Sequence, residues 1–156
     1  MKNLLQELQE TLYVDIPLTK HLALKVDTYD NERLVLRAPL AQNINHKGTA
    51  FAGSLNAVVT LSGWGLLWLV LKEIGVRAVI VIQDSTSNYL LPVKDDFSAC
   101  CYKPDEAQIA RLKQMLLKKG RARLELKAEI IADQKVAVTF QGRYVVSLYE
   151  DEGIFS

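Results

Sequence analysis

The chain contains only two cysteines and two histidines, which are frequent nucleophiles, bases and metal ligands. Cys100 and Cys101 are adjacent in a candidate strand, where a disulfide between neighbours would be badly strained. Two cysteines without a second pair also make no metal-site motif, so reduced thiols in the core are expected. A catalytic pair between a cysteine and His21 or His46 is possible, but no motif supports it. We therefore expect neither a metal site nor a cysteine nucleophile.

A second feature is the absence of charge from Gly48 to Leu71. A run of this length could span a bilayer. Glycine, serine, threonine and asparagine interrupt it, however, and Lys47 and Lys72 bracket it symmetrically, without the asymmetry that orients a membrane helix. We interpret it as a long helix, about Gly53 to Gly75, buried in the centre of a globular protein. The amino terminus has no signal peptide, and a cytoplasmic protein without membrane contact is expected.

The size and charge of the chain limit the remaining classes. Its 156 residues are 49% hydrophobic and 24% charged, enough for one domain with a sizeable core. We expect a single domain over residues 1–150 and a loose tail over residues 151–156. The formal net charge of +1 is too balanced for the basic footprint that nucleic-acid binding needs.

The elements that must position any site follow from hydrophobic spacing and turn residues. The expected order is a helix over 3–13, strands over 21–27 and 33–38, the central helix, a strand over 78–82 continuing into polar residues 83–88, a strand over 97–102, a helix after Pro104 that ends at Gly120, and strands over 123–130 and 135–148. The apolar residues 78–82 suit a strand buried on both faces. Gly142 is expected at a bulge or a close approach. This makes six strands and one buried central helix, with two smaller helices.

Two segments carry a family resemblance. Asn45-His46-Lys47-Gly48-Thr49-Ala50-Phe51-Ala52-Gly53-Ser54-Leu55 resembles the loop-to-helix segment Asn-x-x-Gly-x-x-His-Gly-Gly of hotdog thioesterases of the phenylacetyl-CoA type. Asn88-Tyr89-Leu90-Leu91-Pro92 resembles the Tyr-Leu-Arg-Pro segment of the same family. From about Leu4 to Leu148 the chain is similar to thioesterases of the YiiD carboxy-terminal type. The resemblance implies an α+β hotdog fold, a six-stranded curved antiparallel sheet wrapped around one long central helix, with a short N-terminal helix and an inserted helix before the fifth strand.

The resemblance also implies a site. Thioester hydrolysis develops negative charge on the acyl oxygen, which free N–H groups at a helix start can stabilise. The donors would be Ala52 and Gly53, and Asn45 would orient a water or the carbonyl. Gly48, Thr49, Phe51 and Asn88 would contact substrate. The competing interpretation is that Asn45 and Thr49 merely organise the loop and cap the helix, and for Thr49 it is at least as good.

The chain departs from the family pattern where the base should stand. Thr60 replaces the helix carboxylate, Ile82 the strand serine and Phe51 the histidine. Asp84 is the first alternative base, because it lies two residues beyond Ile82, on the same face of a regular strand, and follows an apolar run that would raise its pKa. His46 is the second. A structural carboxylate and a solvated loop histidine are the competing interpretations.

A basic cluster surrounds the end of the inserted helix. It comprises Arg111, Lys113, Lys118, Lys119, Arg121 and Arg123. Lys118, Lys119 and Arg121 in particular could receive the phosphates of coenzyme A or an acidic acyl-carrier protein. Solvation of an exposed helix face is the simpler interpretation.

The residues and the family resemblance are compatible with three functions. The first is hydrolysis of an acyl-CoA or acyl-carrier-protein thioester, with no cofactor beyond the coenzyme A or phosphopantetheine of the substrate. The second is a non-catalytic acyl-thioester binding module, favoured by the missing helix acid. The third, hydration or dehydration of acyl thioesters, needs a histidine with an acid close to the helix start, where Phe51 stands in place of a polar residue. The resemblance further implies a homodimer or a dimer of dimers, with each site shared between a helix start and another subunit's strand.

Overall fold

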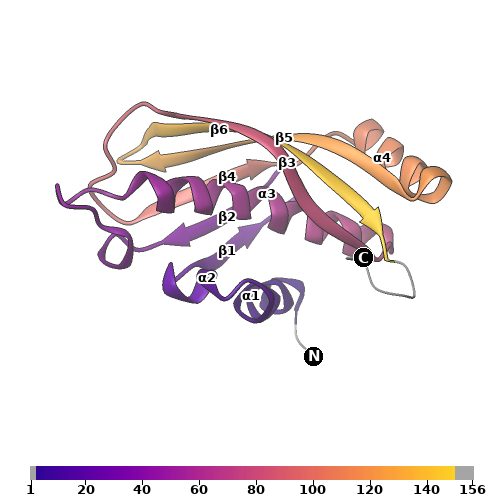
Figure 1. The fold of residues 1–156 in the computed structure, drawn as a ribbon, viewed down its shortest axis with the longest axis horizontal. Coiled ribbons are helices and arrows are strands. Elements are labelled where there is room, and N and C mark those ends of the chain that lie inside the picture. The colour runs from indigo at the N-terminus through magenta and orange to yellow at the C-terminus, as the bar shows by residue number, and fades with distance from the viewer. Residues whose placement is uncertain (1–2, 150–156) are drawn as a thin grey trace.

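Six antiparallel strands form one curved sheet around the long helix α3, as Figure 1 shows, and this confirms the predicted fold class. The structure is a computed structural model that describes residues 3–149, and the predicted tail over residues 151–156 lies outside the described residues. The elements are α1 (Leu4–Asp15), α2 (Leu18–His21), β1 (Lys25–Tyr29), β2 (Arg33–Ala38), η1 (Ala41–Asn43), α3 (Ala52–Ile74), β3 (Ala78–Tyr89), β4 (Phe97–Tyr102), α4 (Glu106–Lys119), β5 (Arg121–Ala132) and β6 (Lys135–Leu148). The strand order is β1-β2-β4-β5-β6-β3.

The charge-free run forms α3, which begins at Ala52, one residue before the predicted start. Its 23 residues and mean hydropathy of 1.6 would allow it to cross a membrane by length and composition, but 67% of its most apolar stretch is buried inside the domain. The prediction of a buried central helix is therefore confirmed. The helix ends at Gly75, whose left-handed backbone (φ 72°) lets its N–H bond the carbonyls of Leu71 and Lys72.

The middle of α3 is fixed to the sheet through Tyr144. Its hydroxyl donates to the carbonyl of Thr60 at 2.7 Å. A Cβ at Gly63 would lie 2.1 Å from the same hydroxyl oxygen, so only glycine leaves room for the ring. Gly142 is also a close-approach point, because a Cβ there would lie 2.7 Å from the ring of Phe140. These contacts determine which face of α3 the sheet covers.

The strand predicted over residues 21–27 begins too early. Residues after Pro17 add a second short helix, α2, which ends at His21. Ala23 then has a positive φ of 54°, a conformation that breaks extended backbone. β1 consequently begins only at Lys25, because local turn formation after Pro17 wins over the alternation of Leu22 and Leu24.

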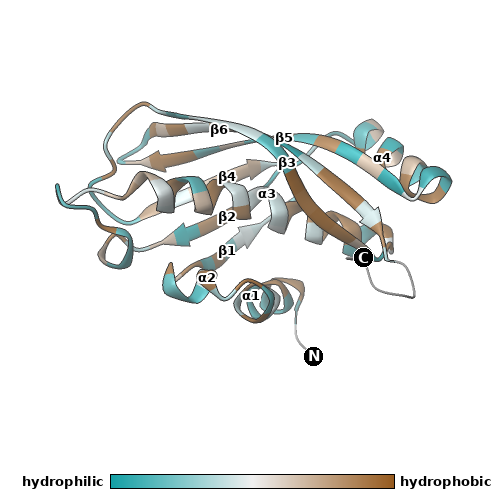
Figure 2. Ribbon diagram, in the orientation of Figure 1, coloured by the Kyte–Doolittle hydropathy of each residue, from teal (hydrophilic) through white to brown (hydrophobic). Residues whose placement is uncertain are grey.

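The prediction that residues 78–82 are buried on both faces is wrong. These residues begin β3, which is an edge strand, and the side chains of Val81 and Ile82 are 46% and 36% exposed. Figure 2 shows this apolar half of β3 in brown beside the more polar half that follows. Its apolar residues are typical of a buried strand, although no strand among residues 3–149 pairs with its outer edge.

The other edge of the sheet is protected. β1 has only five residues, carries a bulge between Val26 and Thr28, and lies beside α1. The side chain of Gln9 in α1 accepts a hydrogen bond from the N–H of Val26 at 2.7 Å and donates to the carbonyl of Leu24 at 3.0 Å. Short length, a bulge and a covering helix are the usual means of preventing edge pairing.

Candidate active site at the start of the central helix

The two segments that carry the family resemblance meet at one cavity, which we call the helix-start pocket. It has a volume of about 250 Å³. Its lining residues are Asn45, Ala50, Ala52, Leu55, Tyr89, Leu90, Leu91, Pro92 and Val93. The pocket therefore joins the loop before α3, the first turn of α3 and the segment that follows β3.

The first turn of α3, which lines this pocket through Ala52 and Leu55, has free backbone donors. α1 and α4 both begin with a capping box, from Asn3 and Asp105, whereas the N-cap of α3 is Phe51, without a side-chain hydrogen bond. The first N–H groups of a helix have no intrahelical acceptor. Those of Ala52 and Gly53 bond no acceptor among residues 3–149, and both residues are exposed. With the helix dipole behind them, they form a site suited to an oxyanion.

Asn45 has a structural position in the loop as well as lining the pocket. Its Oδ1 accepts hydrogen bonds from the N–H of Lys47 at 2.8 Å and of Thr49 at 3.1 Å, and its Nδ2 donates to the hydroxyl of Thr49 at 2.9 Å. Gly48 supplies the positive φ of 78° that closes this turn. The interpretation that Asn45 and Thr49 organise the loop is thus confirmed, although Thr49 does not cap the helix.

Sequence reasoning missed Asn43, which anchors the loop from below. It is 2% exposed, its Nδ2 donates to the carbonyls of Leu22 and Pro39, and its own carbonyl accepts the N–H of Phe51 at 2.7 Å. Its backbone therefore fixes the residue that precedes the free donors. No spacing pattern could have found it, because its partners come from three separate segments.

A polar pair beside the helix start was also missed. Asn56, one turn into α3, accepts a hydrogen bond through its Oδ1 from the hydroxyl of Ser87 in β3 at 2.8 Å. The hydroxyl of Thr60 donates to the carbonyl of Asn56 at 2.8 Å. Asn56 and Thr60 lie within the first three turns of α3, close to the free donors. Asn56 is the only amide side chain in the charge-free run, and that was the available signal.

Asp84 does not share the face of Ile82, so that prediction is wrong. A bulge between Ile82 and Asp84 reverses the alternation of β3, and Asp84 pairs in register with Arg143 on the outer face of the sheet. The carboxylate lies 3.5 Å from the guanidinium of Arg143, and both side chains are about half exposed. Asp84 therefore faces away from α3, a position that supports the structural interpretation rather than a role as base.

Three further predicted site residues do not line the helix-start pocket. His46 is exposed on the loop and does not line the pocket, so its role as base stays a prediction. Phe51 is 56% exposed at the helix start. Asn88 lines a shallow hollow on the outer face with Thr86 and Gln141. The predicted substrate contact of Asn88 is therefore not at the helix-start pocket.

The basic cluster lies around the end of α4. Lys118, Lys119 and Arg121 are exposed, at the end of α4 and the start of β5, and Figure 1 shows α4 at the opposite end of the molecule from the beginning of α3. Within one chain these cations do not reach the helix-start pocket.

The cysteines behave as core residues. Both are buried free thiols, and burial raises the pKa of Cys101 to about 12 and raises that of Cys100 as well. A thiol with such a pKa is not a nucleophile near neutral pH. Within residues 3–149, no three His, Cys, Asp or Glu side chains gather in a way that could hold a metal ion.

A curved sheet around one central helix, with free backbone donors at the helix start beside a partly apolar pocket, places the chain in the hotdog fold, and its structural neighbours of this fold are thioesterases. More particularly, residues 5–148 match the family model described as "Putative thioesterase (yiiD_Cterm)", and the chain belongs to this family. The family and its solved relatives support thioester hydrolysis as the general chemistry.

Three solved structures resemble the chain over nearly its whole length. A "putative thioesterase" from Shewanella oneidensis is 33% identical, with a TM-score of 0.85 over 96% of this chain and 100% of that one. A protein of unknown function from Chlorobaculum tepidum is 31% identical, with a TM-score of 0.89 over 92% and 94%. A "probable thioesterase" from Pseudomonas aeruginosa is 21% identical, with a TM-score of 0.81 over 96% and 99%, and supports the fold.

Proposed function

We propose that the protein hydrolyses an acyl thioester of coenzyme A or of an acyl-carrier protein in the cytoplasm. The observation that carries this proposal is the uncapped start of α3 in a partly apolar pocket. The N–H groups of Ala52 and Gly53 would stabilise the negative charge that develops on the acyl oxygen, and oriented donors of this kind lower a barrier more than flexible ones. Coenzyme A or phosphopantetheine enters as part of the substrate, and no further cofactor is proposed.

The attacking water is held by neutral polar groups in this proposal. No carboxylate among the described residues lines the helix-start pocket, whereas Asn56, Thr60 and Ser87 form a polar group beside it. Amide and hydroxyl oxygens can accept a hydrogen bond from water and so orient it toward the carbonyl. The absence of a strong base predicts modest turnover.

A homodimer formed through β3 completes the proposal. β3 is a 12-residue edge strand with exposed Val81 and Ile82, while the opposite edge, β1, is short and covered by α1. A long edge strand without a neighbour, here apolar over its first half, is a template for pairing with another chain. Antiparallel pairing of two copies of β3 would join the two sheets. A further association of two dimers stays a prediction from the resemblance.

The sharpest test removes one donor without removing the helix. Ala52 is the first residue of α3, a position where proline is tolerated, and the extended backbone of Phe51 (φ −65°, ψ 132°) suits a residue before proline. Ala52→Pro should lower kcat for acyl-CoA hydrolysis by about 100-fold or more while the far-ultraviolet circular dichroism is unchanged. Glu106→Pro, at the same position of α4, is the matched control and should keep its activity.

The second candidate function is a non-catalytic acyl-thioester binding module, which the lack of a carboxylate in the pocket favours. Release of free thiol from a panel of acyl-CoAs separates the two. Binding of a substrate by calorimetry without thiol release would establish the binding module. Release that Ala52→Pro leaves unchanged would contradict the proposed role of the helix start.

A further inference from the structure

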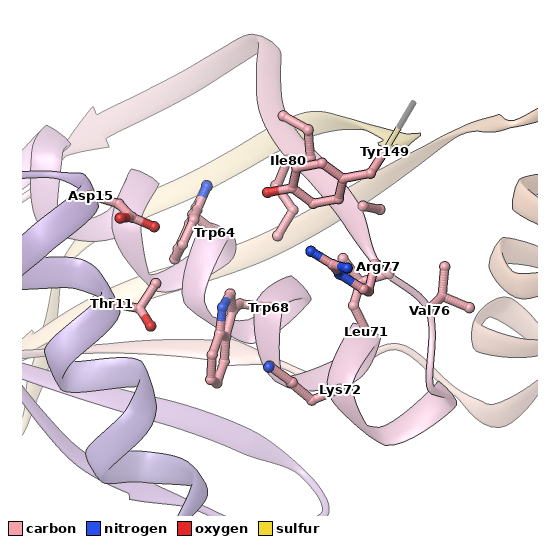
Figure 3. Close-up of a pocket in the computed structure, with 12 residues that line it drawn as sticks. Thr11, Asp15, Trp64, Trp68, Leu71, Lys72, Val76, Arg77, Ile80 and Tyr149 are labelled. Carbon is pink, nitrogen blue, oxygen red and sulfur yellow. The ribbon is translucent and has the colours of Figure 1, made fainter. Parts of the chain in front are cut away.

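A second cavity lies at the opposite end of α3 and contains both tryptophans of the chain. This Trp pocket has a volume of about 290 Å³, and its apolar walls include Trp64, Trp68, Leu71 and Ile80. Figure 3 shows the two indole rings side by side on α3, between the end of α1 and the start of β3. A pocket of this size is close to the lower end of the range for small-molecule sites.

The tryptophans continue the open face of α3 that begins with the site residues. Asn56, Thr60, Trp64 and Trp68 recur every four residues and therefore share one face. All four are exposed or half-buried, whereas most of their neighbours on the helix are buried. The face is polar near the helix start and aromatic toward the helix end.

Within one chain the helix-start pocket and the Trp pocket are too far apart to hold one acyl group. Ala52 and Trp64 are separated by about 18 Å along α3, and Ile80 and Tyr89 by about 30 Å along β3. The polar face around Asn56 and Thr60 lies between them. An apolar chain bound at the helix start would have no continuous apolar path to the tryptophans of the same chain.

Pairing through β3 removes this separation. A two-fold axis through the middle of β3 (Ala78–Tyr89) exchanges the two ends of the strand, so Ile80 of one chain comes near the end of β3 in the other. Ile80 lines the Trp pocket and Tyr89 lines the helix-start pocket. The Trp pocket of each subunit would therefore lie beside the helix-start pocket of its partner.

The chemistry of the Trp pocket indicates an apolar occupant. Its two rim cations already lie over aromatic rings, Lys72 over Trp68 at 4.9 Å and Arg77 over Tyr149 at 5.4 Å. The two indoles, Leu71 and Ile80 line the pocket with apolar surface, and Thr11 and Asp15 of α1 add a hydroxyl and a carboxylate, of which the carboxylate would repel an anion. An acyl chain gains free energy from burial against such walls, whereas a phosphate would have to draw the cations away from the rings.

We infer that Trp64 and Trp68 of one subunit form the acyl-binding wall of the partner's active site, and that the acyl group is a chain of medium length. This inference rests on the proposed thioesterase function and on pairing through β3. The small volume of the Trp pocket limits the chain length, and each site is incomplete without the second copy.

Mixed dimers test whether the wall acts in trans. One chain carries Ala52→Pro and the other carries Trp64→Leu with Trp68→Leu, and two different affinity tags isolate the mixed dimer after co-expression. Each variant homodimer should hydrolyse decanoyl-CoA at less than about a tenth of the wild-type rate. The mixed dimer should recover about half of the wild-type rate, because one of its two sites receives an intact helix start and an intact wall. If a folded mixed dimer recovered no hydrolytic activity, the wall would act in cis and the inference would be overturned.

Tryptophan fluorescence gives an independent readout on the wild-type protein, so it does not depend on the folding of any variant. Because both tryptophans lie in the Trp pocket, S-decyl-coenzyme A, a thioether that cannot be hydrolysed, should shift the emission in a saturable way, and coenzyme A alone should not. A shift with coenzyme A alone would assign the pocket to the nucleotide and overturn the inference. Calorimetric binding of S-decyl-coenzyme A without any shift would overturn it while leaving the proposed function intact. If the protein showed no binding of S-decyl-coenzyme A and no thiol release from acyl-CoA, both the proposed function and the inference would be rejected.

Discussion

At its amino-terminal end α3 begins with an exposed phenylalanine in place of a capping side chain, whereas its carboxy-terminal end is closed by several interactions. Gly75 satisfies the carbonyls of Leu71 and Lys72. Glu73 accepts a hydrogen bond from the hydroxyl of Tyr29 in β1 and forms an ion pair with Lys103 at 2.9 Å. The last turn is therefore tied to β1 and to the segment after β4, while the first turn offers free donors to solvent.

The difference shows that the start of α3 lacks a stabilising N-cap hydrogen bond. An N-cap side chain is worth about 1 kcal/mol, and α1 and α4 both have one. At the start of α3 that contribution is missing at the point where an acyl oxygen would bind. Donors already bonded to a cap could not bond a substrate, so the open end is what a binding site requires.

The largest expected loss of stability comes from a substitution at Gly63, which lies in α3 between the two ends. A Cβ there would lie 2.1 Å from the hydroxyl of Tyr144, a side chain that is 1% exposed and cannot move aside. Overpacking costs up to about 3 kcal/mol, and the better helix propensity of alanine returns about 1 kcal/mol. Gly63→Ala should therefore lower the free energy of unfolding by about 2 kcal/mol in urea titrations.

Gly65→Ala is the matched control for that substitution. Its Cβ would lie 3.1 Å from the flexible end of Leu34, which can adjust by a few tenths of an ångström. We expect a change within about 0.5 kcal/mol. Equal destabilisation by the two substitutions would show that the hydroxyl of Tyr144 does not fix the middle of α3.

A smaller effect should appear at the closed end and should depend on pH. Burial, with the hydrogen bond to Glu73, raises the pKa of Tyr29 to about 12 from its ordinary value of 10.0. Between these values the folded protein holds a proton that the unfolded chain releases, so this contribution to stability is present below pH 10 and is lost as pH rises through 12. The stability advantage of the wild type over Tyr29→Phe should therefore shrink between pH 9 and pH 12.

Glu73→Gln tests the same end near neutral pH. The ion pair with Lys103 is partly exposed and screened, so we expect a loss of about 1 kcal/mol or less in the free energy of unfolding at pH 7. Thiol release from acyl-CoA should be unchanged, because Glu73 faces Tyr29 and Lys103 and lines neither the helix-start pocket nor the Trp pocket. A clear fall in turnover would contradict the assignment of Glu73 to stability.

The sequence predicts features that depend on the local pattern of residues, but not those that depend on contacts between distant segments. The central helix and the order of strands follow from hydrophobic spacing, which a single chain displays, and the two segments of the resemblance, represented by Ala52 and by the residues after β3, meet at one pocket. The face of Asp84 could not be predicted, because one bulge in β3 reverses every side chain beyond it. The contact of Asn56 with Ser87 joins residues 31 positions apart, and no periodicity reports such a contact.

One substitution should increase stability, and it tests the open end most directly. Asp is among the best N-cap residues, and Phe51 already has the extended backbone of an N-cap and is 56% exposed, so little packing is lost on its replacement. Phe51→Asp should raise the free energy of unfolding by up to about 1 kcal/mol, because its carboxylate accepts hydrogen bonds from the first turn of α3. The same carboxylate would occupy donors that the acyl oxygen needs and would repel its developing charge, so turnover should fall by about tenfold or more. Phe51→Asn, a neutral cap, should stabilise similarly and lose less activity, because only the competition for donors remains. A stabilised Phe51→Asp protein with wild-type turnover would mean that the first turn of α3 is open for a reason other than catalysis.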